Sequence, residues 1–172
     1  MLDDELNLVR LANTAANQYF LTNPDKLRLL VSSAGITAED HVVEVGAGAG
    51  TVAAFVPPSA SLTLIELDER MIPILTKRFP TARVLHGDAL SLLPELDCDV
   101  LLSNLPGELT PELLAQLASL TCRIAVVAVG EVADADFLAG QVDVEKLAVL
   151  EPDDFTPAQP RSSELLRIVR RD

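Results

Sequence analysis

A glycine-rich turn between two apolar segments is the part of the sequence best suited to holding a cofactor. Residues 42–51 read VVEVGAGAGT, and the apolar segment that follows ends in Glu66. In doubly wound α/β sheets, a strand, a glycine turn and a second strand ending in an acid bind the adenosine part of a cofactor. Gly46, Gly48 and Gly50 would let the ligand approach the backbone without meeting a side chain. The Glu66 carboxylate could then hold the two ribose hydroxyls.

Two residues of this segment favour S-adenosylmethionine over a dinucleotide. The dinucleotide fingerprint requires a third glycine where this chain has Thr51, and Glu44, two residues before the turn, is foreign to that fingerprint. S-Adenosylmethionine has no pyrophosphate to cradle, so it does not need the missing glycine. The alternative is a glycine-rich turn of some other α/β protein.

A second acid follows the third predicted strand. The carboxylate of Asp88 could accept a hydrogen bond from the exocyclic amine of an adenine ring, and the backbone N–H of Ala89 could donate to a ring nitrogen. The alternative is an ordinary aspartate turn or helix cap. The position of Asp88, 22 residues after Glu66, favours adenine binding in a chain that already has the glycine turn.

The fourth predicted strand ends in Asn104, Leu105 and Pro106. Ligands of open α/β sheets lie at the carboxyl ends of the strands, so Asn104 should face a transferred methyl group. The Asn104 amide and the Leu105 carbonyl, held by the following Pro106, could accept hydrogens from an amine nucleophile. Methyl transfer needs mainly alignment and exclusion of water. The alternative is a strand-ending turn.

The order of the predicted elements indicates an α/β fold with one doubly wound, mostly parallel sheet. Helical periodicity covers 3–17, and Asn23 with Pro24 predicts a capped helix that stops near Gly35. A short helix should follow the glycine turn, and two candidate strands near the end could form an antiparallel hairpin at the sheet edge. The predicted strands are 41–46, 61–67, 83–86, 99–103, 123–129, 142–150 and 164–169, and the further helices are 69–79 and 111–121.

Composition makes nucleic acid an unexpected partner. The chain has 172 residues, of which 49% are hydrophobic, a mean hydropathy of +0.30 and a formal net charge of −13. A phosphate backbone repels such a surface, and aromatic residues, at 3%, offer few stacking platforms for bases. We therefore expect nucleic acid to be bound only with the help of a partner, whereas a cationic acceptor would be attracted.

Other features indicate a single cytoplasmic domain. No apolar run approaches the roughly 20 residues of a membrane span, and the N-terminus is acidic, unlike a signal peptide. We expect helices over the cofactor site in 1–40, a core in 41–130 and the terminal hairpin, a plausible homodimer edge, in 131–172. Cys98 and Cys122 are expected to be buried small hydrophobes rather than a disulfide framework or a metal site, and no metal site is predicted.

Taken together, the motifs resemble those of the rRNA adenine N6-dimethyltransferase family, which includes the erythromycin-resistance enzymes. Gln18, Phe20 and Leu21 are similar to its N-terminal Gln-x-Phe-Leu cofactor motif, and the run from Val43 to Gly50 is similar to its first motif. The resemblance extends along most of the chain. Its other elements are the ribose-binding acid in Ile65-Glu66-Leu67-Asp68, the adenine turn Gly87-Asp88-Ala89, the catalytic Asn104-Leu105-Pro106 and the acceptor-contacting Phe155 of Phe155-Thr156-Pro157.

The departures from the family pattern concern the methyl acceptor. Gly107 stands where the family has a tyrosine that stacks on the target adenine. We expect the family's basic segment after the fifth strand to be mostly missing, with only residues 129–132 remaining, and its C-terminal helical domain to be absent. We therefore expect an S-adenosylmethionine-dependent methyltransferase that acts on a non-rRNA acceptor: a small molecule, a lipid amine or a protein. The alternatives are rRNA adenine methylation with a partner, and a cofactor-binding module without catalysis.

Overall fold

The structure is a computed structural model that describes residues 2–104, 115–116, 119, 121–130 and 142–171. Its α-helices are α1 (Leu2–Leu11), α2 (Pro24–Ser33), α3 (Ile72–Arg78) and α4 (Ala89–Leu92). Its 3₁₀ helices are η1 (Thr14–Ala16), η2 (Ala53–Phe55), η3 (Glu69–Met71), η4 (Leu93–Glu95) and η6 (Pro152–Asp154). Its strands are β1 (Phe20–Leu21), β2 (His41–Val45), β3 (Ser61–Glu66), β4 (Arg83–His86), β5 (Val100–Asn104), β6 (Ile124–Gly130), β7 (Val142–Leu150), β8 (Phe155–Thr156) and β9 (Ser163–Arg170).

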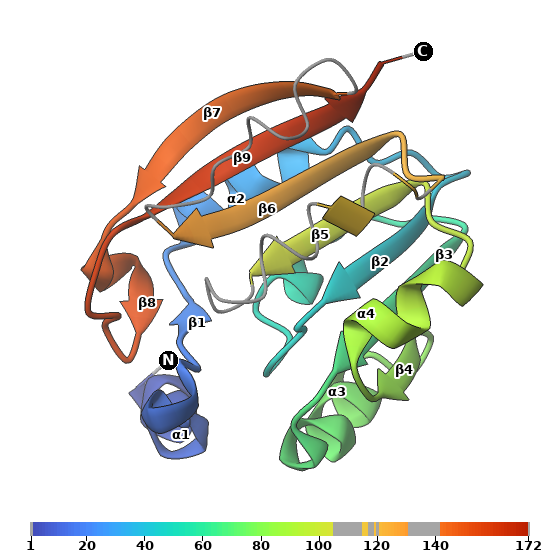
Figure 1. Ribbon diagram of the computed structural model, residues 1–172. Helices are drawn as coiled ribbons and strands as arrows, with labels where there is room; N and C mark the ends of the chain where they lie inside the picture. Colours follow the sequence, from blue (N-terminus) through green and yellow to red (C-terminus); the bar gives the residue numbers. More distant parts are fainter. Residues whose placement is uncertain (1, 105–114, 117–118, 120, 131–141, 172) are drawn as a thin grey trace.

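Within the described residues, seven strands form one sheet in the order β4-β3-β2-β5-β6-β9-β7 (Figure 1). β4, β3, β2, β5 and β6 are parallel, and β9 runs antiparallel between β6 and β7. The chain reverses its direction of sheet growth between β3 and β5, on either side of β2, which is the point where open α/β sheets bind ligands. The mostly parallel sheet and its antiparallel terminal hairpin are therefore confirmed.

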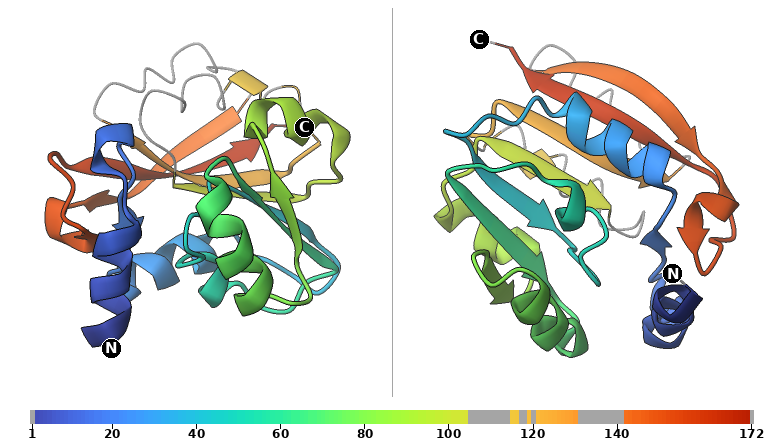
Figure 2. Two further views of the ribbon diagram at one scale, coloured as in Figure 1. Left: turned by 90° about the horizontal axis from the view of Figure 1, so that it is seen from below. Right: turned by 180° about the vertical axis from the view of Figure 1, so that it is seen from behind.

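Both faces of the central strands β2, β5 and β6 are buried, which explains why these strands are apolar without alternation. One set of alternate strand residues, including Val42, Leu102 and Val126, packs with Leu30 of α2. The other set packs with Leu93 of η4 and with the side chains of α4. Figure 2 shows α2 on one side of the sheet and α4 on the other. The doubly wound arrangement follows from this burial on both faces.

The N-terminal segment is less helical than its periodicity predicts. The expected helix over 3–17 ends at Leu11, because Asn17 adopts a left-handed conformation (φ 54°) and the Asn13 amide donates to the Gln18 side chain (2.8 Å). The short helix expected after the glycine turn is only the 3₁₀ turn η2. Most of the helix expected over 111–121 lies outside the described residues.

A two-stranded sheet that the sequence does not predict joins β1 to β8 in antiparallel register. Leu21 pairs with Phe155, and the hydroxyl groups of Thr22 and Thr156 lie 2.7 Å apart. Both strands are two residues long, which is too short for a periodic signal. The pair fixes the N-terminal motif beside the segment before β9.

The two cysteines are buried as expected, but they form a disulfide bond, which was not expected. Cys98 precedes β5 and Cys122 precedes β6, and because these strands are neighbours, the two Cα atoms lie 5.1 Å apart. Sequence reasoning missed the bond because the two positions are 24 residues apart and meet only through the pairing of β5 with β6.

The Asn23 side chain contacts both the start of α2 and η6, so substitutions of Asn23 test the packing of α2 against η6. Its side-chain oxygen accepts hydrogen bonds from the Asp25 and Lys26 amides, and its Nδ2 donates to the buried Asp154 (2.6 Å). We expect Asn23→Ala to lower the free energy of unfolding by about 2 kcal/mol, because it removes a helix cap and leaves a buried acceptor without its donor. Urea unfolding would measure this, with Asn23→Ser, which keeps the cap, as the milder control. Asn23→Ser also lacks the donor to Asp154, so an unchanged stability of this variant would contradict the role of the Asp154 contact, and equal losses for both variants would contradict the role of the cap.

Candidate functional site

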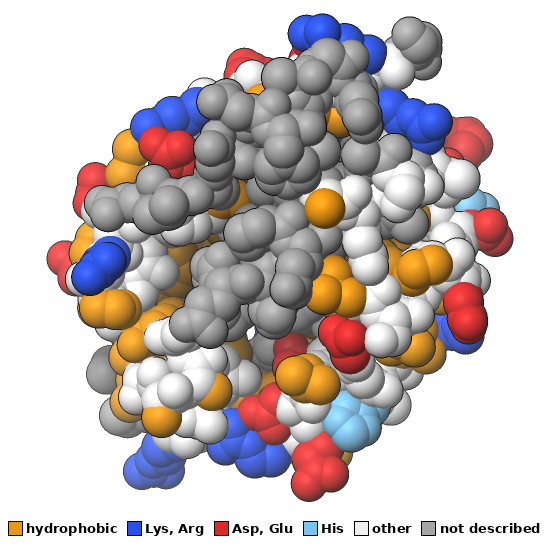
Figure 3. Space-filling view, in the orientation of Figure 1, with side chains coloured by type: hydrophobic (Ala, Val, Ile, Leu, Met, Phe, Trp, Pro, Cys, Tyr) orange, Lys and Arg blue, Asp and Glu red, His pale blue; other side chains and the backbone are white. Residues whose placement is uncertain are grey.

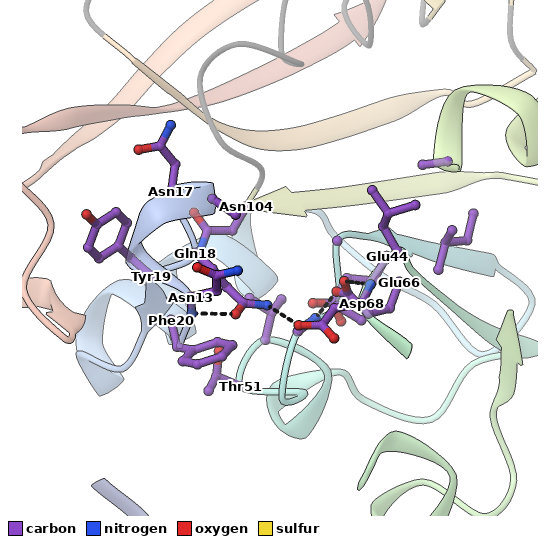
Figure 4. A pocket seen from close by; sticks show the side chains of 18 of the residues that line it. Asn13, Asn17, Gln18, Tyr19, Phe20, Glu44, Thr51, Glu66, Asp68 and Asn104 are labelled. Atoms are coloured by element: carbon purple, nitrogen blue, oxygen red, sulfur yellow. Dashed lines mark hydrogen bonds between the residues drawn. The ribbon is translucent and has the colours of Figure 1, made fainter. Parts of the chain in front are cut away.

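A cavity of about 360 Å³ lies at the carboxyl ends of β2, β3 and β4, next to the end of β5 (Figure 4). Its walls come from the segment before β1, the glycine turn after β2, the end of β3 and the turn before α4. The predicted residues that line it are Gln18, Phe20, Glu44, Gly46, Gly48, Glu66, Leu67, Asp88, Ala89 and Asn104. The structure therefore brings most of the predicted cofactor residues to one cavity.

Glu66 connects the ends of the neighbouring strands β2 and β3. Its Oε2 accepts a hydrogen bond from the Gly48 amide (2.6 Å) and its Oε1 accepts one from the Asp68 amide (2.8 Å). The side chain is 7% exposed, so the two amides hold a nearly buried carboxylate in one orientation. Each carboxylate oxygen can accept a second hydrogen bond, which leaves Glu66 able to bind a ligand hydroxyl in the cavity.

The glycine turn has the backbone shape that its sequence predicts. Gly48 has φ +55°, and a Cβ built on it would lie 2.9 Å from the Phe20 ring. Gly50 has φ +83°, and its Cβ would lie 2.4 Å from the Phe79 ring, but Gly50 does not line the cavity. Gly50 thus lies against Phe79, and its contact with the cofactor stays a prediction. Thr51, in contrast, lines the cavity.

Glu44 is a buried acid without a complete set of partners. The residue is 1% exposed, and its Oε2 has no hydrogen-bond partner among the described residues. Burial first, and the neighbouring charge of Glu66 second, raise the pKa of Glu44 to about 8, although a hydrogen bond from the Ala53 backbone opposes the shift. A cation placed in the cavity would supply the missing partner and favour the ionised carboxylate.

The segment before β1 closes one side of the cavity. Gln18 donates from Nε2 to Asp68 (3.4 Å), and Arg70 bridges Asp68 to the Leu11 carbonyl. A hydrogen bond from Arg70 is the main cause that lowers the pKa of Asp68. Figure 4 shows Gln18 and Asp68 connected across the cavity wall. Asp68 was not predicted as a site residue, although it directly follows the Glu66-Leu67 pair in the sequence.

The turn before α4 has two roles. Asp88 caps α4 by accepting hydrogen bonds from the Leu90 amide (3.2 Å) and the Ser91 hydroxyl (2.9 Å), and it also lines the cavity with Ala89. Leu67, which also lines the cavity and is 65% exposed, offers an apolar surface. Asp88 can therefore cap α4 and still offer its carboxylate to an adenine ring, so the two roles considered for it do not exclude each other.

A second cavity of about 160 Å³ adjoins the first. Phe155, Gln159, Arg161 and Ser163 line it, together with the end of β6. Three residues line both cavities: Asn17, Tyr19 and Asn104. The predicted catalytic residues Asn104 and Phe155 therefore share the smaller cavity, whereas Leu105 and Pro106 lie outside the described residues.

The two cavities differ in charge. Among the described lining residues, the larger one carries four acids and no base, and the smaller one has Arg161 as its single charged side chain. Figure 3 shows acidic side chains beside hydrophobic ones on this face of the molecule. Leu21 lines neither cavity and is buried in the core with Phe155, and its contact with the cofactor stays a prediction.

Within the described residues, no group of three His, Cys, Asp or Glu side chains could hold a metal ion. No helix in the same part of the chain is long and apolar enough to cross a membrane.

The fold and the cavity at its switch point define a class I, Rossmann-like methyltransferase domain. The sequence model of the family "Ribosomal RNA adenine dimethylase" matches residues 9–131. This match covers more than half of the 172 residues, so the chain belongs to the ribosomal RNA adenine dimethylase family.

Two relatives are ribosomal RNA small subunit methyltransferase A proteins. The chain is 37% identical over 117 residues to that of Bifidobacterium adolescentis, with 58% of this chain and 39% of the relative covered. It is 30% identical over 182 residues to that of Corynebacterium efficiens, with 89% and 63% covered. The chain therefore spans less than two thirds of either relative.

Two solved structures share the fold. A dimethyladenosine transferase from Plasmodium falciparum has a TM-score of 0.80 and 23% identity, with 88% of this chain and 63% of that chain covered. The 23S rRNA methyltransferase ErmE has a TM-score of 0.80 and 18% identity, with 88% and 70% covered. Both structures are similar to this chain in the arrangement of the sheet and its helices.

Glu44 should impose a characteristic pH dependence on stability. Because the folded protein retains the Glu44 proton up to about pH 8, whereas the unfolded chain releases it near 4.5, ionisation of this group favours unfolding as the pH rises between these values. We expect Glu44→Gln to gain stability relative to the unmodified protein from pH 5 to pH 8, by at most about 1.4 kcal/mol per pH unit.

Urea unfolding at several pH values would measure this gain. Glu39→Gln, which removes an exposed carboxylate, is the matched control. A Glu44→Gln difference that does not change with pH would show that Glu44 is not a buried acid of raised pKa.

Proposed function

We propose that this protein binds S-adenosylmethionine in the larger cavity and transfers its methyl group to the exocyclic amine of a nucleobase in RNA. The observation that carries the proposal is the position of Asn104, which lies at the end of β5 and lines both cavities. A methyl group donated from one cavity would meet an amine in the other beside this amide. Family membership supports both parts of the proposal.

The residues of the larger cavity fit the cofactor. The buried Glu44 oxygen without a partner suits a cationic ligand, and the spare acceptor sites of Glu66 suit ribose hydroxyls. Leu67 could cover one face of the adenine ring while Asp88 and Ala89 bind its edge. Phe20 lies so close to Gly48 that a side chain at this position would not fit, and both residues line the cavity.

Asn104 and its surroundings would align the amine. When bound, S-adenosylmethionine would supply the methyl group: an N–C bond would form as the C–S bond breaks, the electron pair of that bond would stay on sulfur, and the amine proton would pass to water. The Asn104 amide oxygen can accept a hydrogen from the amine and so direct its lone pair toward the larger cavity. Phe155 in the smaller cavity would contact the acceptor ring.

The charge of the smaller cavity favours a phosphate-bearing acceptor over a cationic one. Arg161 is exposed and makes no ion pair or hydrogen bond with the described residues, so it is available to a phosphate group. The net charge of −13 still opposes RNA binding, and we propose that a partner with basic groups helps to hold the RNA.

Among three candidate functions, methylation of an RNA base has the most support. A non-rRNA acceptor was expected first, but the comparisons do not support it, since the relatives are named as ribosomal RNA methyltransferases. The acidic surface is the observation that still favours a small amine or a protein acceptor. A cofactor-binding module without catalysis is the third possibility.

Asn104→Ala separates catalysis from cofactor binding. We expect it to lower kcat for methyl transfer about 100-fold or more, since it removes the group that aligns the amine, without weakening cofactor affinity. Transfer of labelled methyl groups to ribosomal RNA would measure kcat, and calorimetry would measure affinity. Asn7→Ala, at an exposed position of α1, is the matched control.

Glu66→Gln tests the cofactor site separately. We expect S-adenosylmethionine affinity to fall about 10- to 100-fold, because hydrogen bonds to a charged group are lost.

Transfer of label to small amines or proteins, and not to RNA, would favour the alternative acceptor. Cofactor binding without transfer to any acceptor would leave the non-catalytic module.

A further inference from the structure

Three polar side chains meet where the two cavities join. Asn17, Tyr19 and Asn104 line both cavities, and Figure 4 shows them at the end of the larger cavity that lies away from the carboxylates of Glu44 and Glu66. Asn104 has a role in the proposed function. Asn17 and Tyr19 belong to neither the glycine turn nor the strand ends, and their position requires a separate explanation.

The pairing of β1 with β8 directs Tyr19 toward the smaller cavity. Side chains alternate along a strand, so Phe20 faces the glycine turn while its neighbours Tyr19 and Leu21 face the other way. Leu21 is paired with Phe155, and Tyr19 packs against the same apolar cluster that contains Phe155. The Tyr19 ring is therefore directed away from the Phe20 ring, as Figure 4 shows, and shares the smaller cavity with Phe155.

The polar groups at this junction have no hydrogen-bond partners in the part of the chain that the structure describes. The side chains of Asn17, Tyr19 and Asn104 make no hydrogen bond with the described residues. Asn17 also adopts φ 54° and ψ 32°, a left-handed conformation that is uncommon for a residue with a side chain. An amide and a phenol are thus presented to the space between the cavities, free to contact a ligand.

We propose that Tyr19 and Asn17 are acceptor-binding residues. Tyr19 supplies an aromatic surface to the acceptor ring, with Phe155 in the same cavity, and Asn17 offers its amide to the edge of that ring opposite Asn104. Tyr19 thereby provides the kind of aromatic contact that Gly107 cannot provide. This inference rests on the proposed function, because it assumes that the smaller cavity takes the methyl acceptor, and it defines that acceptor as a planar heteroaromatic ring.

Tyr19 reports on its own contacts, because the chain has one tyrosine and no tryptophan. Tyrosine fluorescence of the protein therefore comes from Tyr19 alone. With the larger cavity saturated by S-adenosylhomocysteine, a short single-stranded RNA that contains adenosines should quench this fluorescence saturably. An abasic RNA of the same length, which carries the same phosphates without rings, should not. Equal responses to both RNAs, or no response to either, would overturn the inference.

Variants test the same contact through kinetics. Tyr19→Ala should raise the KM for RNA about 10-fold or more, in line with the loss of one base–aromatic contact, and Tyr19→Phe, which keeps the ring, should restore most of it. Asn17→Gly, which removes the amide and still permits the left-handed backbone, should lower kcat/KM for RNA about 10-fold. The affinity for S-adenosylhomocysteine should change by less than about 3-fold in all three, since Glu44, Glu66 and Asp88 remain.

Phe55→Ala is the matched control for folding. Phe55 is a partly buried aromatic residue that packs against the same apolar cluster as Tyr19 but lines neither cavity. If Tyr19 were only a packing residue, Tyr19→Ala and Phe55→Ala would both lower the melting temperature, and neither would change the KM for RNA. That result would overturn the inference.

The outcomes distinguish this inference from the proposed function. Methyl transfer to RNA that Tyr19→Ala and Asn17→Gly leave unchanged would support the function and refute the roles of these residues. Base-dependent quenching of Tyr19 without methyl transfer would support the binding roles and refute catalysis. Absence of both would refute the inference and the function together.

Discussion

The hydrogen bonds from the Gly48 and Asp68 amides to Glu66 are the contacts on which the site depends. They join the turn after β2 to the end of β3, and so fix the two sides of the cavity relative to one another. They also hold a negative charge close to the buried Glu44, whose pKa is raised by burial and by that charge. The fold thus holds two carboxyl groups together in a site that is largely buried from solvent, which favours the binding of a cation.

The N-terminal segment couples the cavities. Gln18 reaches Asp68 on the cofactor side, Phe20 packs on the glycine turn, and Leu21 pairs with Phe155 on the acceptor side. Residues 18–21 thus connect the cofactor side to Phe155, which lines the smaller cavity. The antiparallel β9 and β8, which follow the parallel part of the sheet, complete the smaller cavity.

The sheet and most of the larger cavity could be predicted from the sequence because their signals are local. Apolar runs, the glycine turn and the acids that follow the strands each lie within a few residues. The β1–β8 pair, the Cys98–Cys122 disulfide and the shared lining by Asn17 and Tyr19 could not be predicted, since they depend on contacts between distant segments. Gly50 and Leu21 lie against Phe79 and Phe155 and outside the lining of the larger cavity, so their contacts with the cofactor stay predictions.

The central claim is that the buried acids bind a cationic adenosyl cofactor, and calorimetric titration with S-adenosylmethionine at pH 7 tests it most directly. With a pKa of about 8, Glu44 is mostly protonated before binding, and a bound cation should make it release its proton. Titrations in two buffers of different ionisation enthalpy should therefore show saturable binding with release of nearly one proton. The Glu44→Gln variant should release no proton on binding. Absence of saturable binding, or binding without proton release by the unmodified protein, would contradict the account.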